Sequence, residues 1–108
     1  MPPTLGEFEQ LVLFAILRLD GDAYGVTVRD ELRRRAGREV SLGTVYKTLL
    51  RLEAKGLLLA RVGEPTAERG GRRKKYYAIT AAGRRALEHA LAALRGMTRG
   101  LGHAWSIS

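Results

Sequence analysis

Arginine and lysine side chains gather at two places in the sequence where their charge would suit a nucleic-acid phosphate backbone. At the first, four consecutive cations (Arg72, Arg73, Lys74 and Lys75) follow a Gly70-Gly71 pair and precede the apolar run YYAI. Two adjacent glycines give the backbone freedom to turn and to approach a surface closely. A run of like charges is more often only a solvated surface, so the rest of the chain has to decide between the two interpretations.

The second place is the stretch SLGTVYKTLLRLEAK, residues 41–55. Its apolar residues recur at steps of three and four, which predicts a helix with one buried face. The residues of that face are Leu42, Val45, Leu49 and Leu52. The opposite face carries small, hydroxylated or cationic side chains, namely Gly43, Thr44, Lys47, Thr48 and Arg51. Small residues permit close approach to a DNA groove, donors reach base edges and cations bind phosphates, so this face has the chemistry of a recognition helix.

Both ends of this helix are marked in the sequence. Ser41 predicts its start, because the hydroxyl can accept a hydrogen bond from an amide of the first turn. Val40 and Val45 stand at the two positions of a hydrophobic staple, and Gly56 predicts a Schellman-type ending. Tyr46 lies at the border between the two faces. Its ring could pack inward while its hydroxyl reaches a phosphate, and packing in the core alone is an equally good interpretation.

The overall charge favours a polyanionic partner. The chain of 108 residues carries a net charge of +8 at pH 7, and its isoelectric point is near 10.6. Residues 1–28 hold four carboxylates against Arg18, a net charge of −3, so the remainder carries +11. A protein that needed only solubility would not separate its charges in this way. One end of the molecule is therefore expected to face an anion.

Length and composition limit the fold and the chemistry. A chain of 108 residues with 45% hydrophobic residues fits one globular domain. It contains no cysteine, which excludes disulfides, thiolate zinc sites and cysteine nucleophiles. This is compatible with a reducing cytoplasm, where we expect the protein to act. The longest apolar run, LVLFAIL, is far too short for a membrane span and lacks the preceding basic segment of a signal peptide, so no membrane partner is expected.

Hydrophobic periodicity predicts four helices and two strands. In chain order, the expected elements are helices over 5–19, 24–36 and 42–55, strands over 57–62 and 75–79, and a helix over 81–97. The first helix is apolar on more than one side, which indicates that several elements cover it. A basic loop of about twelve residues joins the two strands. Thr80 is placed to cap the last helix.

This order describes a winged helix-turn-helix, a mainly α fold with a small β-hairpin, followed by a C-terminal helix. Residues 1–80 are expected to form the DNA-binding domain, and residues 81–108 a dimerisation helix and tail. The cation run then falls on the wing, which is the hairpin with its connecting loop. There the four cations of the run, Arg72, Arg73, Lys74 and Lys75, would contact phosphates. The binding interpretation of the run is therefore favoured over the solvated one.

Three segments in this order and spacing resemble the PadR family of bacterial and archaeal transcriptional regulators: DAYGVTVRDEL, SLGTVYKTLLRLEAKGLL and GGRRKKYYAITAAGRRAL. With a single C-terminal helix, the chain is similar to the short subgroup. The resemblance implies a homodimer that binds palindromic operator DNA, usually as a repressor, and that a small, often aromatic, effector releases. It also implies DNA contacts from Ser41, Gly43, Thr44, Tyr46 and Lys47, together with Arg72, Arg73 and Lys74.

The last helix is expected to form the dimer interface. Its apolar residues recur at a spacing close to 3.5 residues, typical of a helix–helix seam. They are Leu87, Leu91, Leu94, Met97 and Leu101. The alternative is that this helix folds back on its own domain, although the first helix is wide enough to fill that place. Trp105, the only tryptophan, is a candidate wall of an effector pocket, but a tail residue packed on the core is the commoner case.

Other classes of function fit the sequence less well. His89 and His103 are the only histidines, and GEPTAERGG lacks the Lys-Ser/Thr ending of a phosphate-binding loop. We therefore expect that the protein is not an enzyme and that it binds no cofactor or metal ion. Two alternatives stay open. One is a winged helix that binds an acidic protein, and the other is a non-specific architectural DNA binder, whose phosphate contacts carry no base information.

Overall fold

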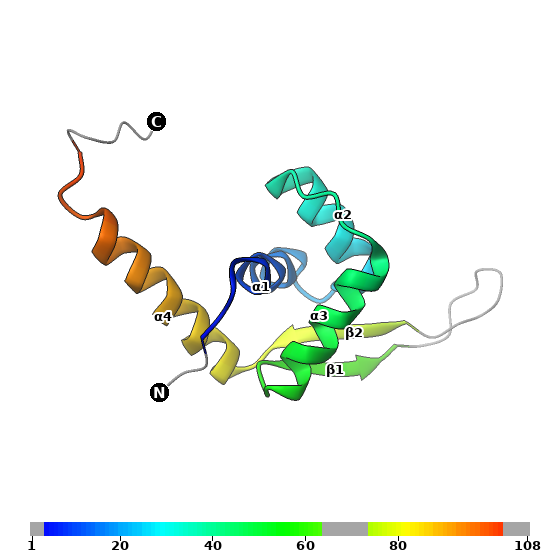
Figure 1. Cartoon of the computed structure of the whole chain (residues 1–108). Coiled ribbons are helices and arrows are strands. Elements are labelled where there is room, and N and C mark those ends of the chain that lie inside the picture. Colours follow the sequence, from blue (N-terminus) through cyan, green and yellow to red (C-terminus); the bar gives the residue numbers. More distant parts are fainter. Residues whose placement is uncertain (1–3, 64–73, 103–108) are drawn as a thin grey trace.

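The computed structural model describes residues 4–63 and 74–102, which form four helices and one two-stranded sheet (Figure 1). The helices are α1 (Glu7–Leu19), α2 (Gly25–Ala36), α3 (Leu42–Ala54) and α4 (Ala81–Thr98), and the strands are β1 (Leu58–Val62) and β2 (Lys75–Ile79). The strands pair antiparallel, with Leu58 opposite Ile79 and Val62 opposite Lys75. The predicted order of elements is confirmed. Arg72, Arg73 and Trp105 lie outside the described residues.

Helix α1 is the centre of the hydrophobic core, and it contacts α2, α3, α4 and β2. Its side chains Val12, Leu13 and Ile16 are buried. Each surrounding element adds buried residues to the same cluster, among them Leu32 of α2, Leu49 of α3, Tyr77 of β2 and Leu87 of α4. The prediction that several elements cover the first helix is confirmed. This coverage explains why α1 carries apolar residues on more than one side.

Helix α3 begins and ends as the sequence predicts. The Ser41 hydroxyl oxygen accepts a hydrogen bond from the Thr44 amide at 3.1 Å. At the other end, Gly56 has a φ of 77°, in the left-handed region that glycine adopts without strain. The amides of Gly56 and Leu57 donate to carbonyls of the last turn at 2.9 and 3.0 Å, which completes a Schellman motif.

The end of α3 is joined tightly to the start of α4. The Thr80 hydroxyl donates to the Gly56 carbonyl at 2.7 Å and accepts from the Gly83 amide at 3.0 Å. The Thr80 amide donates to the Leu57 carbonyl at 3.0 Å. A Cβ atom at Gly83 would lie 2.2 Å from that same carbonyl oxygen, so only glycine lets the two backbones approach this closely. The junction fixes the direction in which α4 leaves the core.

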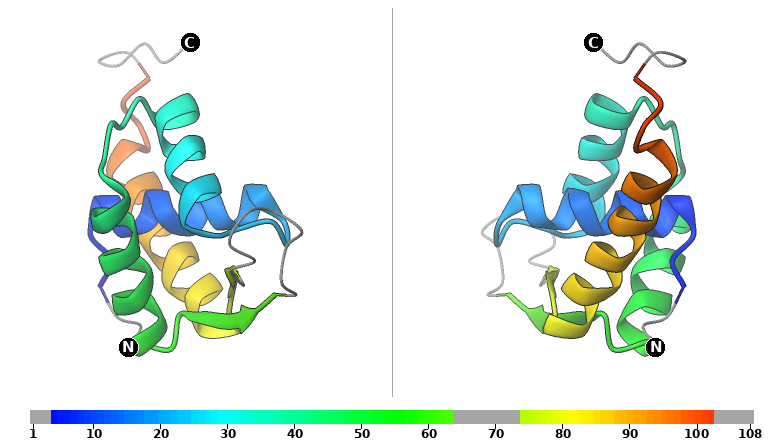
Figure 2. Two further views of the ribbon diagram at one scale, coloured as in Figure 1. Left: turned by 90° about the vertical axis from the view of Figure 1, so that its right-hand side faces the viewer. Right: turned by 90° about the vertical axis from the view of Figure 1, so that its left-hand side faces the viewer.

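Helix α4 belongs to the core only through its first half, and its second half points away on the side opposite α3 (Figures 1 and 2). Leu87 departs from the predicted interface stripe, because it is 3% exposed and belongs to the core cluster of its own domain. The rest of the stripe is accessible: Leu91 is half-buried, while Leu94, Met97 and Leu101 are 55%, 78% and 36% exposed. No helix in the described residues is long and apolar enough to cross a membrane.

Substitution of Gly83 by alanine is expected to lower the free energy of unfolding by about 1–3 kcal/mol. The added methyl group would meet the Leu57 carbonyl oxygen at 2.2 Å and the Ile79 side chain at 2.8 Å. Urea unfolding followed by circular dichroism measures the change. Gly96→Ala is the matched control in the same helix, because a Cβ there meets nothing within 4 Å. If Gly83→Ala unfolded at the same urea concentration as the wild type, the described junction would be wrong.

Candidate nucleic-acid interface

The exposed face of α3 is narrower and more apolar than the sequence indicated. The residues along its centre are Gly43, Lys47, Leu50 and Ala54, all exposed and spaced by three or four positions. Thr48, predicted on this face, is instead buried, with 2% exposure. Its hydroxyl donates to the Thr44 carbonyl at 3.0 Å, which satisfies the polar group inside the core. Leu50 was not among the predicted residues of this face.

The start of α3 presents the small and hydroxylated residues that a close approach to DNA requires. Ser41, Gly43 and Thr44 are all exposed. The Ser41 hydroxyl donates to the Thr44 hydroxyl at 2.9 Å, so the two side chains are held side by side at the helix N-terminus. The positive end of the helix dipole at this position favours a phosphate. The three predicted DNA contacts are therefore accessible together.

Tyr46 rests on the start of α2 instead of packing inside the core. It is 45% exposed. A Cβ atom at Gly25 would lie 2.4 Å from Cε1 and 2.8 Å from the hydroxyl oxygen of Tyr46, so the ring lies directly on the glycine backbone. Packing in the core alone is therefore the wrong interpretation. The side chain packs on the domain and remains accessible beside the exposed face of α3.

Arg51, a predicted DNA contact, is joined to α1 by its side chain. Arg51 Nε donates to Glu9 Oε2 at 3.2 Å, and Lys55 Nζ donates to the same oxygen at 2.9 Å. The other Glu9 oxygen accepts from the Gly6 amide at 3.0 Å. Arg51 thus lies on the flank of α3 that faces α1, where it holds the two helices together. Its side chain is still 53% exposed, and its contact with DNA stays a prediction.

The Glu9 carboxylate is stabilised in its charged form. Burial raises its pKa, but the hydrogen bonds from the Gly6 amide, Lys55 and Arg51 outweigh burial and hold the pKa below the ordinary value of 4.5. Glu9 is therefore a charged group at neutral pH although only 7% of the residue is exposed. Sequence reasoning missed this cluster because Glu9 and Arg51 are far apart in the chain.

Aromatic and cationic side chains stack at the base of the wing. The Tyr24 and Tyr76 rings meet edge to face, with 5.4 Å between their centroids. Lys74 Nζ lies 4.5 Å from the centre of the Tyr24 ring, and the Arg61 guanidinium lies 4.7 Å from that of Tyr76. Attraction between the cations and the ring faces holds this stack together. Lys74, a predicted DNA contact, is thereby placed beside the start of α2.

Two further contacts tie the wing to the helices. Lys75 Nζ donates to Glu53 Oε1 of α3 at 3.1 Å, a hydrogen bond that raises the pKa of Lys75. The Tyr77 amide of β2 donates to the carbonyl of Ala23, just before α2, at 2.8 Å. The wing base, the start of α2 and helix α3 are therefore held together on the side of the molecule away from the second half of α4 (Figure 2).

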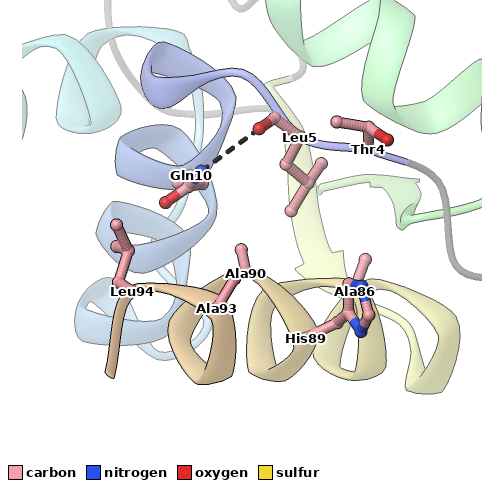
Figure 3. Close-up of a pocket in the computed structure, with 8 residues that line it drawn as sticks. All are labelled: Thr4, Leu5, Gln10, Ala86, His89, Ala90, Ala93 and Leu94. Carbon is pink, nitrogen blue, oxygen red and sulfur yellow. Dashed lines mark hydrogen bonds between the residues drawn. The ribbon is translucent and has the colours of Figure 1, made fainter. Parts of the chain in front are cut away.

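A groove of about 290 Å³ lies between α4 and the chain around the start of α1 (Figure 3). Its lining residues are Thr4, Leu5, Gln10, Ala86, His89, Ala90, Ala93 and Leu94. The Gln10 side-chain amide donates to the Leu5 carbonyl at 3.1 Å on one wall. The groove is lined by small alanines of α4 and adjoins the exposed apolar stripe at Leu94. In the described part of the chain, no cluster of acidic or histidine side chains is suited to hold a metal ion.

Comparison with known proteins identifies the fold and the family. The model of the transcriptional regulator PadR-like family matches residues 13–89. The chain belongs to this family. The transcriptional regulator Rv3488 of Mycobacterium tuberculosis is 42% identical over 82 residues, which cover 74% of this chain and 70% of the relative.

Two solved PadR regulators have the same architecture. A PadR family transcription regulator from Clostridium difficile R20291 has a TM-score of 0.72 at 26% identity, covering 90% of this chain and 96% of that one. A PadR family regulator from Eggerthella lenta has a TM-score of 0.66 at 27% identity, covering 94% and 88%. The resemblance drawn from the three sequence segments and the winged-helix fold class are confirmed. The PadR family consists of transcriptional regulators and not of enzymes.

Replacement of Glu9 by glutamine is expected to lower the free energy of unfolding by on the order of 1 kcal/mol at neutral pH, because charge-assisted hydrogen bonds from Arg51 and Lys55 are weakened. The folded-state pKa of Glu9 lies below the ordinary 4.5, so its stabilisation is present above pH 4.5 and is lost as the pH falls through the folded pKa. The wild type and the variant should therefore converge in acid.

Urea unfolding of both proteins between about pH 7 and pH 3 measures this convergence. Glu7→Gln is the control, because Glu7 is an exposed carboxylate paired only with Arg38 among the described contacts, and little change is expected. Equal stability at pH 7, or a difference that persists unchanged at pH 3, would contradict the assigned role of Glu9.

Proposed function

We propose that this PadR-like regulator is a homodimeric repressor that binds palindromic operator DNA through α3 and the wing. The observation that carries the proposal is the shared surface of the two elements. The exposed face of α3 has no carboxylate at its centre, and Glu53 at its edge is paired with Lys75. Membership of a family of transcriptional regulators supports the proposal.

In the proposed complex, α3 enters the major groove and the wing follows the phosphate backbone. Gly43 allows close approach, and Lys47 reaches a base edge or a phosphate. Ser41, Thr44 and Tyr46 contact phosphates at the start of the helix. The wing adds the positive charge of Arg72, Arg73 and Lys74. Their attraction to phosphates does not depend on the sequence of the DNA.

We assign DNA binding to residues 1–80 and dimerisation to residues 81–108, with the first turns of α4 anchored in the core. The second half of α4 supports this assignment, because Leu94 and Met97 are largely exposed on its surface. Burial of such side chains stabilises an interface by about 1.5–3 kcal/mol each. A two-fold axis along this stripe would present one α3 from each subunit to successive major grooves.

A small aromatic effector is proposed to bind in the groove between α4 and the start of α1. Two features of the groove support this proposal: its alanine lining and its position beside the dimerisation stripe. A ligand bound there would alter the relative placement of the subunits. Trp105, which the sequence suggests as an aromatic wall, follows this helix in the chain.

The proposal is tested by titration of the protein against the DNA upstream of its own gene, at two salt concentrations, with excess unrelated DNA as competitor. We expect binding that survives the competitor, and a Lys47→Ala variant should bind this DNA more weakly. Binding that the competitor abolishes would favour an architectural DNA binder. Absence of DNA binding even at low salt would contradict the proposal and favour a winged helix that binds an acidic protein.

The role of the wing is tested by alanine substitution of Arg72 and Arg73 together. Affinity for all DNA sequences should fall, and the dependence of affinity on salt should become less steep, because fewer phosphate contacts release fewer counterions. An unchanged affinity with an unchanged salt slope would show that the cation run is only a solvated surface.

Met97→Asp is expected to shift the protein from dimer to monomer, because it places a charge in the proposed apolar interface. Sedimentation equilibrium measures the change, with the wild type as reference. Val62→Asp is the matched control, since Val62 is also exposed (62%) but lies on β1, away from α4. A wild type that sediments as a monomer, or a Met97→Asp variant that still dimerises fully, would contradict the proposed interface.

A further inference from the structure

An apolar side chain stands at the centre of the surface that the proposed function places in the major groove. Leu50 is 54% exposed on α3. It follows Lys47 by three residues and Gly43 by seven, so the three residues share one side of the helix. Leu50 does not belong to the buried core, to which Val45, Leu49 and Leu52 of the same helix contribute.

On α3, Tyr46 is the only other large hydrophobic residue that is exposed, so Leu50 does not belong to an apolar stripe of this helix. The other large hydrophobic residues exposed in the described chain, apart from Tyr46, lie on β1 (Leu59 and Val62) or toward the end of the chain (Leu94, Met97 and Leu101). The neighbours of Leu50 on α3 are Lys47 and Tyr46 one turn before it, and Ala54 and Glu53 one turn after it, where the Glu53 carboxylate is paired with Lys75. A leucine among side chains that are mostly polar or small matches the edge of a base pair better than the core of a protein interface.

We propose that Leu50 is a specificity-determining residue that contacts the C5-methyl group of a thymine in the major groove. The inference rests on the proposed function, because it requires that the exposed face of α3 enters DNA. A leucine side chain cannot read hydrogen-bond donors or acceptors. The thymine methyl group is the apolar feature that the major groove presents, and it distinguishes thymine from the other bases.

The helix geometry allows this contact alongside the others. Gly43 and Leu50 are about 10 Å apart along the helix axis, at a rise of about 1.5 Å per residue. This span corresponds to about three base pairs of DNA, at about 3.4 Å for each. Close approach at Gly43, a polar contact from Lys47 and an apolar contact from Leu50 can therefore be made to neighbouring base pairs of one half-site.

The test begins with selection of binding sites from a pool of random duplex DNA by the wild-type protein. Each thymine of the selected site is then replaced in turn by uracil, which lacks only the methyl group. At one thymine in each half-site, we expect the wild-type affinity to fall about four-fold, which corresponds to the loss of one buried methyl group, about 0.8 kcal/mol. Leu50→Ala should bind thymine and uracil equally at this position.

Leu17→Ala is the control, because Leu17 is a half-buried leucine of α1, outside α3, the wing and the proposed dimer stripe, and this variant should keep the four-fold difference. Leu50→Asn, selected against the same pool, should replace the thymine preference with adenine, the base that asparagine pairs with in the major groove. This second variant gives a result even if Leu50→Ala binds too weakly for comparison.

The outcomes separate the inference from the function on which it rests. A selected site at which no uracil weakens wild-type binding would overturn the role of Leu50 and leave the DNA-binding proposal standing. The same conclusion would follow if Leu50→Ala kept the full thymine preference, or if Leu50→Asn selected the wild-type sequence. Failure of the wild type to select any sequence would overturn both.

Discussion

The close approach of α4 to the end of α3 at Gly83 sets the geometry on which the rest of the molecule depends. The Leu57 carbonyl oxygen accepts a hydrogen bond from the Thr80 amide at 3.0 Å, and it leaves no room for a side chain at position 83. Backbone groups therefore fix the angle between the proposed recognition helix and the proposed dimerisation helix. In a symmetric dimer, that angle decides whether the two copies of α3 can reach major grooves about 34 Å apart.

The remaining contacts hold α3 in place from its flanks. Glu9 ties it to α1 through Arg51 and Lys55, and Lys75 of β2 ties it to the wing through Glu53. Within residues 4–63 and 74–102, no carboxylate is paired with the residues at the centre of the exposed face. A surface that is held by contacts on its flanks and accessible at its centre is suited to bind an outside partner.

The separation of charge along the sequence has a structural cause as well as the proposed functional one. Two of the four carboxylates near the N-terminus bind cations from later segments: Glu7 pairs with Arg38, and Glu9 with Arg51 and Lys55. Glu31 of α2 forms ion pairs with Arg18, Arg34 and Arg35. The hydrogen bond from Arg34 is the main reason that the pKa of Glu31 is lowered. The acidic residues thus neutralise part of the positive charge inside the domain.

Local sequence rules predicted the elements but not the contacts between them. Both ends of α3 were predictable, because Ser41 and Gly56 act on backbone groups within a few residues. The positions of Thr48, Arg51 and Leu87 were not, because each depends on an element distant in the sequence or on a partner 42 residues away. Leu50 was missed for a different reason: periodicity shows where a core face lies, but it does not explain an isolated leucine on the opposite face.

Hydroxyl-radical footprinting of the wild-type protein on its selected DNA site tests the central claim most directly. Two α3 helices in successive major grooves predict two protected regions related by two-fold symmetry, with centres about 10 base pairs apart. Additional protection of deoxyriboses beside each region would mark the wings. A single protected region, or uniform protection along the whole fragment, would contradict a dimer that reads DNA through the exposed face of α3.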